Sequence, residues 1–304
     1  MSVREVASGL KFPEGPIAMP DGSIVLVEIA RGTLSRVWNG KTEVIATLGG
    51  GPNGAALGPD GAVYVTNNGG FEWHDRGGLL FPGDRPATYE TGRIERVDLK
   101  TGKVERLFDK CNGLRLNGPN DLVFDKHGGF YFTDLGKGYG RLHDRGAVYY
   151  ATPDGKRISE IVFPIDMPNG CGLSPDEKTL YVAQTMTGRL MKFDIKAPGE
   201  LAAATGPLNG DLVCGMPGLQ LFDSLAVEAN GRVCVATIAL PTGCISSIAP
   251  DGTYEQVQFM DPLVTNICFG GKDMKAATVC LSATGKLVET TWARPGLKLN
   301  YSGW

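Results

Sequence analysis

Short apolar or alternating runs recur along the whole chain, each directly after a tight turn built on Asp, Asn or His. A second short run precedes every turn, so each unit has the pattern strand, turn, strand. Six segments align in this way, and they start at Pro13, Pro52, Pro119, Pro168, Phe222 and Thr265. Such internal repetition predicts a fold assembled from equivalent units placed side by side.

The outer half of each unit is repeated as well. A glycine opens a third strand six times, at Gly32, Gly92, Gly146, Gly188, Gly243 and Gly285. A fourth strand follows in the first five units, for example KTEVIATL and KVERLF. The equivalent positions Glu14 and Asn266 are 266 − 14 = 252 residues apart over five intervals, a mean of about 50, which suits four-stranded propeller blades.

The sixth unit has no convincing fourth strand, whereas the N-terminal stretch SVREVAS has no partner. Pairing the two would close a ring of blades and remove open sheet edges. No amphipathic helical pattern competes with this interpretation. The sequence therefore predicts an all-β protein, a six-bladed β-propeller of four-stranded antiparallel blades with the N-terminal strand closing the last blade. We expect residues 1–304 to form a single domain.

Composition narrows the classes of partner. The chain of 304 residues contains 43 glycines and 19 prolines, and 42% of its residues are apolar, which fits a turn-rich globular protein. A net charge of −3 and a pI near 5.7 disfavour nucleic acid and anionic membrane surfaces as partners. No apolar run approaches the roughly 20 residues of a membrane helix, and the N-terminus lacks the pattern of a signal peptide. A small molecule is the expected partner.

Seven cysteines stand singly, without a C-x-x-C pair, which favours reduced thiols over a disulfide framework. We therefore expect a cytoplasmic protein. For the oligomeric state we expect a monomer or a weak homodimer.

The second position of each unit is always polar. In a propeller the first strand of each blade is innermost, so these six side chains should form a ring around the axis. A local role in turns would explain any one of them. Six equivalent oxygen donors with only two carboxylates instead predict a divalent cation site, with calcium or magnesium preferred. The positions are Glu14, Asn53, Asn120, Asn169, Asp223 and Asn266.

Loops that follow the second strands should share a face with this ring. The longest is residues 67–91, a candidate lid or wall, and the next is residues 135–145. His127 belongs to a turn on the opposite face and is excluded. Side chains that could line a pocket near the ring are Phe71, Trp73, His74, Tyr89, Tyr139 and His143.

With these features the chain resembles the SMP-30/gluconolactonase/luciferin-regenerating-enzyme family of six-bladed propellers over essentially its whole length. The motifs that carry the resemblance are FPEGP, NGPNDLV with YFTD, MPNGCGLSPDEKTLYVA, FDSLAVEANGRVCVA and VTNICFGG. The family binds one divalent metal through four residues. The resemblance places them at Glu14, Asn120, Asn169 and Asp223, four of the six ring positions.

The resemblance implies a metal-dependent lactonase, a carboxylic ester hydrolase that opens a lactone to the hydroxy acid. Asp223 would act as general base toward water or as proton carrier. Asp121 would support the ligands from outside, and Asn53 and Asn266 would face substrate or water. Calcium is the expected metal, with Zn²⁺, Mn²⁺, Mg²⁺ or Fe²⁺ as alternatives.

One departure from the family leaves the substrate open. Animal members carry a sugar-binding arginine two residues before the Asn ligand, where this chain has Gly118, and Gly138 falls near the place of a sugar-binding Glu. Two other functions are alternatives. One is a phosphotriesterase resembling diisopropyl-fluorophosphatase, and the other is a non-catalytic binding propeller plugged by a metal. A condensing enzyme similar to strictosidine synthase is a smaller possibility.

Overall fold

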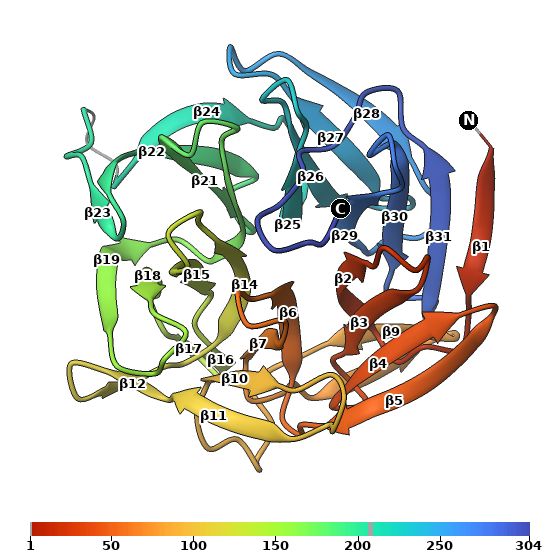
Figure 1. The fold of residues 1–304 in the computed structure, drawn as a ribbon, viewed down its shortest axis with the longest axis horizontal. Coiled ribbons are helices and arrows are strands. Elements are labelled where there is room, and N and C mark those ends of the chain that lie inside the picture. Colours follow the sequence, from red (N-terminus) through yellow and green to blue (C-terminus); the bar gives the residue numbers. More distant parts are fainter. Residues whose placement is uncertain (1, 206–208) are drawn as a thin grey trace.

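The computed structural model describes residues 2–205 and 209–304. Six antiparallel sheets stand around a common axis, which confirms the predicted all-β six-bladed propeller (Figure 1). Among the described residues every regular element is a strand, so no helix is present that could cross a membrane.

Each blade starts with its innermost strand and proceeds outward. Blade 1 contains β2 (Pro13–Ala18), β3 (Ile24–Glu28), β4 (Thr33–Trp38) and β5 (Lys41–Thr47), and blade 2 contains β6 (Pro52–Leu57), β7 (Val63–Asn67), β10 (Arg93–Val97) and β11 (Val104–Phe108). Blade 3 contains β14 (Pro119–Phe124), β15 (Phe130–Asp134), β18 (Gly146–Ala151) and β19 (Ile158–Ile165). Blade 4 contains β20 (Pro168–Leu173), β21 (Thr179–Gln184), β22 (Arg189–Ala197), β24 (Asp211–Gly215) and the short β23 (Glu200–Leu201). Blade 5 contains β25 (Leu221–Val227), β26 (Val233–Ile238), β27 (Cys244–Ile248) and β28 (Tyr254–Gln258).

Blade 6 joins the two ends of the chain. It contains β29 (Val264–Gly270), β30 (Ala276–Leu281), β31 (Lys286–Thr291) and, as its outer strand, β1 (Val3–Ala7). The register pairs Val3 with Thr290 and Arg4 with Glu289. The predicted closure by the N-terminal strand is therefore confirmed. Three small hairpins lie outside the blades: β8 (Trp73–Arg76) with β9 (Leu79–Pro82), β12 (Lys110–Cys111) with β13 (Leu114–Arg115), and β16 (Gly138–Tyr139) with β17 (Leu142–His143).

The apolar core lies between neighbouring blades. Strands β3, β7 and β15 are buried over their whole length, because both faces of a blade are covered. This explains why their sequences are continuous apolar runs, as expected of strands without a solvated face. The outer strands β5 and β28 are largely exposed and mostly polar.

All six innermost strands carry an irregularity at or beside the ring position. The register of each inner strand with its neighbour shifts there, for example between Glu14 and Ile17 or between Pro119 and Leu122. A bulge of this kind changes the direction of a side chain. The residue after the ring position is correspondingly crowded, since a Cβ on Gly15 would lie 2.7 Å from the Ala55 nitrogen.

The C-terminal segment covers the opposite end of the axis (Figure 1). Trp304 donates its indole N–H to the Ala18 carbonyl at 2.9 Å, and the Asn300 amide donates to the Phe124 carbonyl at 3.2 Å. These carbonyls end the inner strands of blades 1 and 3. The segment thereby closes a small central cavity of about 110 Å³, which is lined mostly by apolar side chains and also by Asp121 and Asn266.

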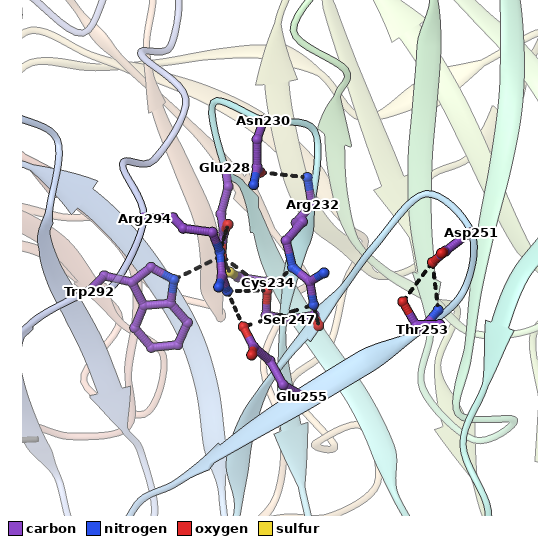
Figure 2. A network of polar contacts seen from close by, with 10 residues as sticks. All are labelled: Glu228, Asn230, Arg232, Cys234, Ser247, Asp251, Thr253, Glu255, Trp292 and Arg294. Atoms are coloured by element: carbon purple, nitrogen blue, oxygen red, sulfur yellow. Dashed lines mark hydrogen bonds and ion pairs between the residues drawn. The ribbon is translucent and has the colours of Figure 1, made fainter.

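A buried carboxylate ties this segment to blade 5. Figure 2 shows Glu228, at the end of β25, accepting hydrogen bonds from Trp292 at 2.9 Å and Ser247 at 3.0 Å, and paired with Arg294. The side chain of Glu228 is fully buried, and all of its partners are donors. These contacts fix the start of the C-terminal segment, which continues toward the central cavity.

Candidate metal centre

The six ring residues lie at the same end of the six inner strands, and neighbouring members interact. The Asn266 amide donates to Glu14 Oε2 at 2.6 Å, which connects the last blade to the first. The Asn53 amide donates to the main-chain carbonyl of Asn120 at 3.1 Å. Five members are almost completely buried, whereas Asp223 is partly exposed.

Two buried oxygens of the ring have no hydrogen-bond partner. Among the described residues they are the only buried side-chain polar atoms in this condition, and they are Glu14 Oε1 and Asn120 Oδ1. An unpaired buried polar atom costs about 1–3 kcal/mol, so such atoms are rare and need an explanation. Both are acceptors without a donor inside the protein, as expected of oxygens that ligate a cation.

The oxygens of Asn53 and Asn266 are occupied. Asn53 Oδ1 accepts from the Asn68 amide at 2.9 Å, and Asn266 Oδ1 accepts from the Ile267 main-chain N–H at 2.8 Å. Their NH₂ groups point to Asn120 and Glu14 instead. These two amides therefore orient other ring residues, and the structure distinguishes them from Glu14 and Asn120.

The remaining two ring residues, Asn169 and Asp223, use only part of their hydrogen-bonding capacity. Asn169 donates to Thr185 Oγ1 at 3.2 Å, while its oxygen receives only a long contact of 3.4 Å from Ser224. Asp223 accepts from the Ser224 main-chain N–H at 3.0 Å through one oxygen. Each residue retains lone pairs that could reach a cation.

Burial and neighbouring acids raise the pKa of both ring carboxylates. Burial, followed by the charge of Asp223, raises the pKa of Glu14 well above its ordinary value. Burial also raises the pKa of Asp223 to about 7, and the charge of Asp121 adds to the shift. A positive charge between them would reverse both effects, because a nearby cation favours the ionised form.

Asp121 belongs to the same group of acids. It follows Asn120 in β14, accepts from the Leu122 N–H at 2.8 Å and lines the central cavity beside the ring. Burial raises its pKa to about 7, although hydrogen bonds from Leu122, Cys171 and Ser224 oppose the shift. Blades 1, 2 and 4 place glycine at this position, for example Gly54, where a Cβ would lie 2.7 Å from the Asn120 carbonyl.

The donor set suits a hard divalent cation. No three His, Cys, Asp or Glu side chains gather in residues 2–205 and 209–304, so a site at the ring must use amide oxygens in addition to its two acids. Carboxylate and amide oxygens are ligands of calcium and magnesium, and all six ring positions carry such oxygens. The residues present thus fit the group that the sequence predicts.

The long segment, residues 67–91, crosses the ring face from blade 2 to blade 6. It contains the hairpin β8–β9 rather than only loop, and Leu80 N–H donates to the Ala283 carbonyl at 3.0 Å. Trp73 packs on Phe12, two residues before Glu14, with ring centroids 5.0 Å apart, and its other neighbour is Phe71 at 6.0 Å. The segment is thus held at Trp73 and at Leu80, as expected of a wall over one side of the ring.

The other predicted pocket residues lie further from the ring. His74 is exposed on the hairpin, where a Cβ on Gly83 would lie 2.5 Å from its Nε2. Tyr139 bonds Asp144 at 3.1 Å and stacks under Arg85, whose Cζ is 3.8 Å from the ring centroid. Tyr139 and Arg85 line a cleft of about 440 Å³ between the long segment and β16. His143 is exposed in β17.

The sequence reasoning missed one buried cation near the ring. Lys137, between β15 and β16, is 1% exposed, and its Nζ contacts the start of the long segment. A single lysine in a glycine-rich loop carries no signal of burial. The polar run NNGG at residues 67–70 was the available hint, because buried backbone and amide oxygens need donors.

The absent family arginine also has a structural reason. A Cβ on Gly118 would lie 2.4 Å from the Gly136 carbonyl oxygen. The two loops are held together by Asp134, which accepts from the N–H groups of Asn117 and Gly118 at 2.7 Å each and of Gly136 at 2.9 Å. This close approach leaves no room for a side chain at position 118.

A six-bladed propeller with a ring of oxygen donors at one end of its axis is the class that fold and site define. The chain belongs to the SMP-30/Gluconolactonase/LRE-like family, whose sequence pattern matches residues 12–283. The gluconolactonase of Zymomonas mobilis is 27% identical, with 94% of this chain and 80% of the relative aligned. The lactonase drp35 of Staphylococcus epidermidis is 31% identical over 71% of this chain and 60% of that protein.

Solved structures agree on the fold. A gluconolactonase from Xanthomonas campestris, XC5397, superimposes with a TM-score of 0.73 at 21% identity, covering 95% of this chain and 89% of that one. A calcium-binding protein, regucalcin, from Agrobacterium tumefaciens superimposes with a TM-score of 0.73 at 18% identity, covering 98% of each chain. At these identities the likeness concerns the propeller fold.

Proposed function

We propose that this protein is a divalent-metal-dependent lactonase that opens a lactone to its hydroxy acid. The observation that carries the proposal is the pair of buried oxygens without a donor, Glu14 Oε1 and Asn120 Oδ1, at the ring. Relatives named gluconolactonase and lactonase support the reaction class. Asn169 and Asp223 complete the proposed ligand set, and calcium is the preferred ion for these oxygens.

The ring residues would have different roles in the reaction. A bound divalent cation would polarise the lactone carbonyl and stabilise charge that develops on its oxygen. Glu14 and Asp223 supply two negative charges, so the loaded site would be close to neutral. Asp223, the partly exposed member of the ring, takes the proton from the attacking water or carries it to the leaving oxygen. Asn53 and Asn266 hold Asn120 and Glu14 in place.

The ring face explains how a small substrate would be confined. The long segment forms a wall with Phe71 and Trp73 on the side of blades 1 and 2. The opposite end of the axis is closed by the C-terminal segment, so entry is from the ring face. The substrate and the attacking water can therefore approach Asp223 from one side of the ring only.

The test is a pH-stat panel of aldonolactones, aliphatic lactones, aromatic lactones and one fluorophosphate. Each is measured with and without chelator on the wild type, on Asp223→Ala and on the exposed control Lys178→Met. We expect lactone turnover that chelation and Asp223→Ala abolish and that Lys178→Met leaves intact. Turnover that survives both treatments would overturn the proposal.

Two other outcomes would favour the alternative functions. Faster turnover of the fluorophosphate than of every lactone would indicate a phosphotriesterase. Stoichiometric metal binding without turnover of any compound would indicate a binding propeller in which the metal is a plug.

A further inference from the structure

Lys137 is buried without a carboxylate partner. It is 1% exposed, and among the described residues no Asp or Glu oxygen lies within 4.0 Å of its Nζ. Burial lowers the pKa of its ammonium group well below the ordinary value, despite the opposing charge of Asp134. Burying a lysine in this way is costly unless its contacts compensate. Those contacts therefore indicate what the side chain does.

All of the contacts of Nζ come from one turn. It donates to the Gly70 carbonyl at 2.6 Å and to Asn68 Oδ1 at 3.0 Å, and it lies 3.5 Å from the centre of the Phe71 ring. These residues are the beginning of the long segment. Gly69 and Gly70 have φ values of 80° and 102°, which bring the Gly70 carbonyl round to the lysine.

The same turn is connected to the proposed metal ligands. Asn68 Oδ1 accepts from Lys137 and from the Gly70 N–H at 2.8 Å, so the Asn68 amide nitrogen must point the other way. It donates to Asn53 Oδ1 at 2.9 Å, and this fixes the Asn53 amide nitrogen toward the Asn120 carbonyl at 3.1 Å. Asn120 carries one of the two unpartnered ring oxygens.

We propose that Lys137 is a positioning residue, which clamps the start of the long segment and thereby fixes Asn68, Asn53 and the ligand Asn120 for metal binding. The inference rests on the proposed function and deepens it. Lys137 itself contacts neither the ring nor, in this role, the substrate. Its Nζ donates to one carbonyl and one amide oxygen and lies over one aromatic ring, and these groups together form the base of the wall.

Calorimetric titration of the metal-free chain with Ca²⁺ tests this without any substrate. Lys137→Met keeps the length of the side chain and removes its donors. We expect it to weaken Ca²⁺ binding about tenfold, the lower end for partners that act behind a ligand. Hydrogen exchange at the Gly70 amide should accelerate in the same variant. Lys178→Met, on an exposed turn at the other face, is the matched control and should change neither quantity.

Asn68→Ala alone covers the case in which Lys137→Met fails to fold, and a double-mutant cycle tests the series when both variants fold. Asn68→Ala removes the connection between Lys137 and Asn53 and should weaken Ca²⁺ binding by a similar factor. In the Asn68→Ala background, Lys137→Met should add less than about twofold, because the two residues act in series.

Unchanged Ca²⁺ affinity in both single variants, with only a lower melting temperature, would overturn the positioning role. Additive losses of Ca²⁺ affinity in the double variant would show that Lys137 and Asn68 do not act in series. A wild type that binds no Ca²⁺, Mg²⁺, Mn²⁺ or Zn²⁺ would instead refute the proposed function, and the exchange rate of Gly70 would then still report whether Lys137 clamps the segment.

Discussion

The Glu14 carboxylate and the Asn266 amide meet at 2.6 Å, although 252 residues separate them along the chain. The bond uses Glu14 Oε2, which also accepts from the Gly15 N–H at 2.7 Å. Glu14 Oε1 consequently remains without a donor inside the protein. The closure between the first and last blades therefore sets the direction of the Glu14 carboxylate.

Replacement of Glu14 by Gln should separate stability from metal binding. The charge of buried Glu14 is unfavourable beside Asp223 in the metal-free chain. Glu14→Gln removes that charge and keeps the shape. We expect the metal-free variant to melt at or above the wild-type temperature at pH 8, whereas its Ca²⁺ affinity should fall by more than about 100-fold, beyond the loss expected for an outer partner. Melting curves with chelator and with Ca²⁺ measure both, and a variant stabilised by Ca²⁺ like the wild type would contradict the ligand assignment.

Two ring asparagines should respond differently to alanine. Asn120 Oδ1 has no partner, so Asn120→Ala should abolish Ca²⁺ binding without the loss of any hydrogen bond to that oxygen. Asn53 has two partners, and Asn53→Ala should cost about 1–3 kcal/mol of unfolding free energy because the Asn68 amide loses its acceptor and the Asn120 carbonyl loses one of its two donors. Its effect on Ca²⁺ affinity should be smaller. Urea denaturation and calorimetry check the ranking, and equal Ca²⁺ losses would argue against it.

The metal-free protein should lose stability as the pH rises. The pKa of Asp223 and that of Asp121 are both raised to about 7, from an ordinary value of 3.8. The folded state then binds more protons than the unfolded state between about pH 4 and pH 7, so the free energy of unfolding falls across that window. Saturating Ca²⁺ should reduce the loss because it favours the ionised ligands. Melting temperatures at pH 5, 6, 7 and 8, with chelator or with Ca²⁺, test this; Asp121→Asn should flatten the chelator series.

The sequence predicted the ring because the repeat aligned six equivalent positions, and position along an inner strand is a property of the pattern. It did not distinguish Glu14 and Asn120 from Asn53 and Asn266 by residue chemistry alone. That difference depends on partners such as Asn68, which belongs to a loop with no repeat. The four-residue set came instead from the family resemblance, and it stays a prediction.

The burial of Lys137 and the contacts of the long segment could not be predicted from the sequence for a similar reason. The position of the long segment over blade 6 follows from one bond to Ala283 and from packing on Phe12, and neither contact leaves a periodic signal. The sequence indicated only that the loop was long and lay on the ring face. Repeats predict the features that the blades share, and the long segment belongs to blade 2 alone.

The carboxylate that anchors the C-terminal segment should matter for stability alone. Glu228 is fully buried against Arg294, so Glu228→Ala should cost about 3 kcal/mol, the lower end for a broken buried pair because Arg294 is partly exposed. Glu289→Ala breaks the exposed pair with Arg4 and should cost less than about 1 kcal/mol. Urea denaturation gives both numbers. Ca²⁺ affinity should stay unchanged in each, and a loss in Glu228→Ala would show that the two ends of the axis are coupled.

The missing arginine should prove impossible to restore by substitution. Any Cβ at position 118 meets the Gly136 carbonyl at 2.4 Å, so even Gly118→Ala should cost about 1–3 kcal/mol or more. Gly215→Ala is the matched control, since a Cβ there meets only ordinary contact at 3.8 Å and should change the unfolding free energy by less than about 0.5 kcal/mol. If Gly118→Arg folds as well as the wild type and gains aldonolactone turnover, the loops of Asn117 and Gly136 can separate. We expect loss of stability without that gain, because Asp134 holds three N–H groups of these loops and fixes their approach.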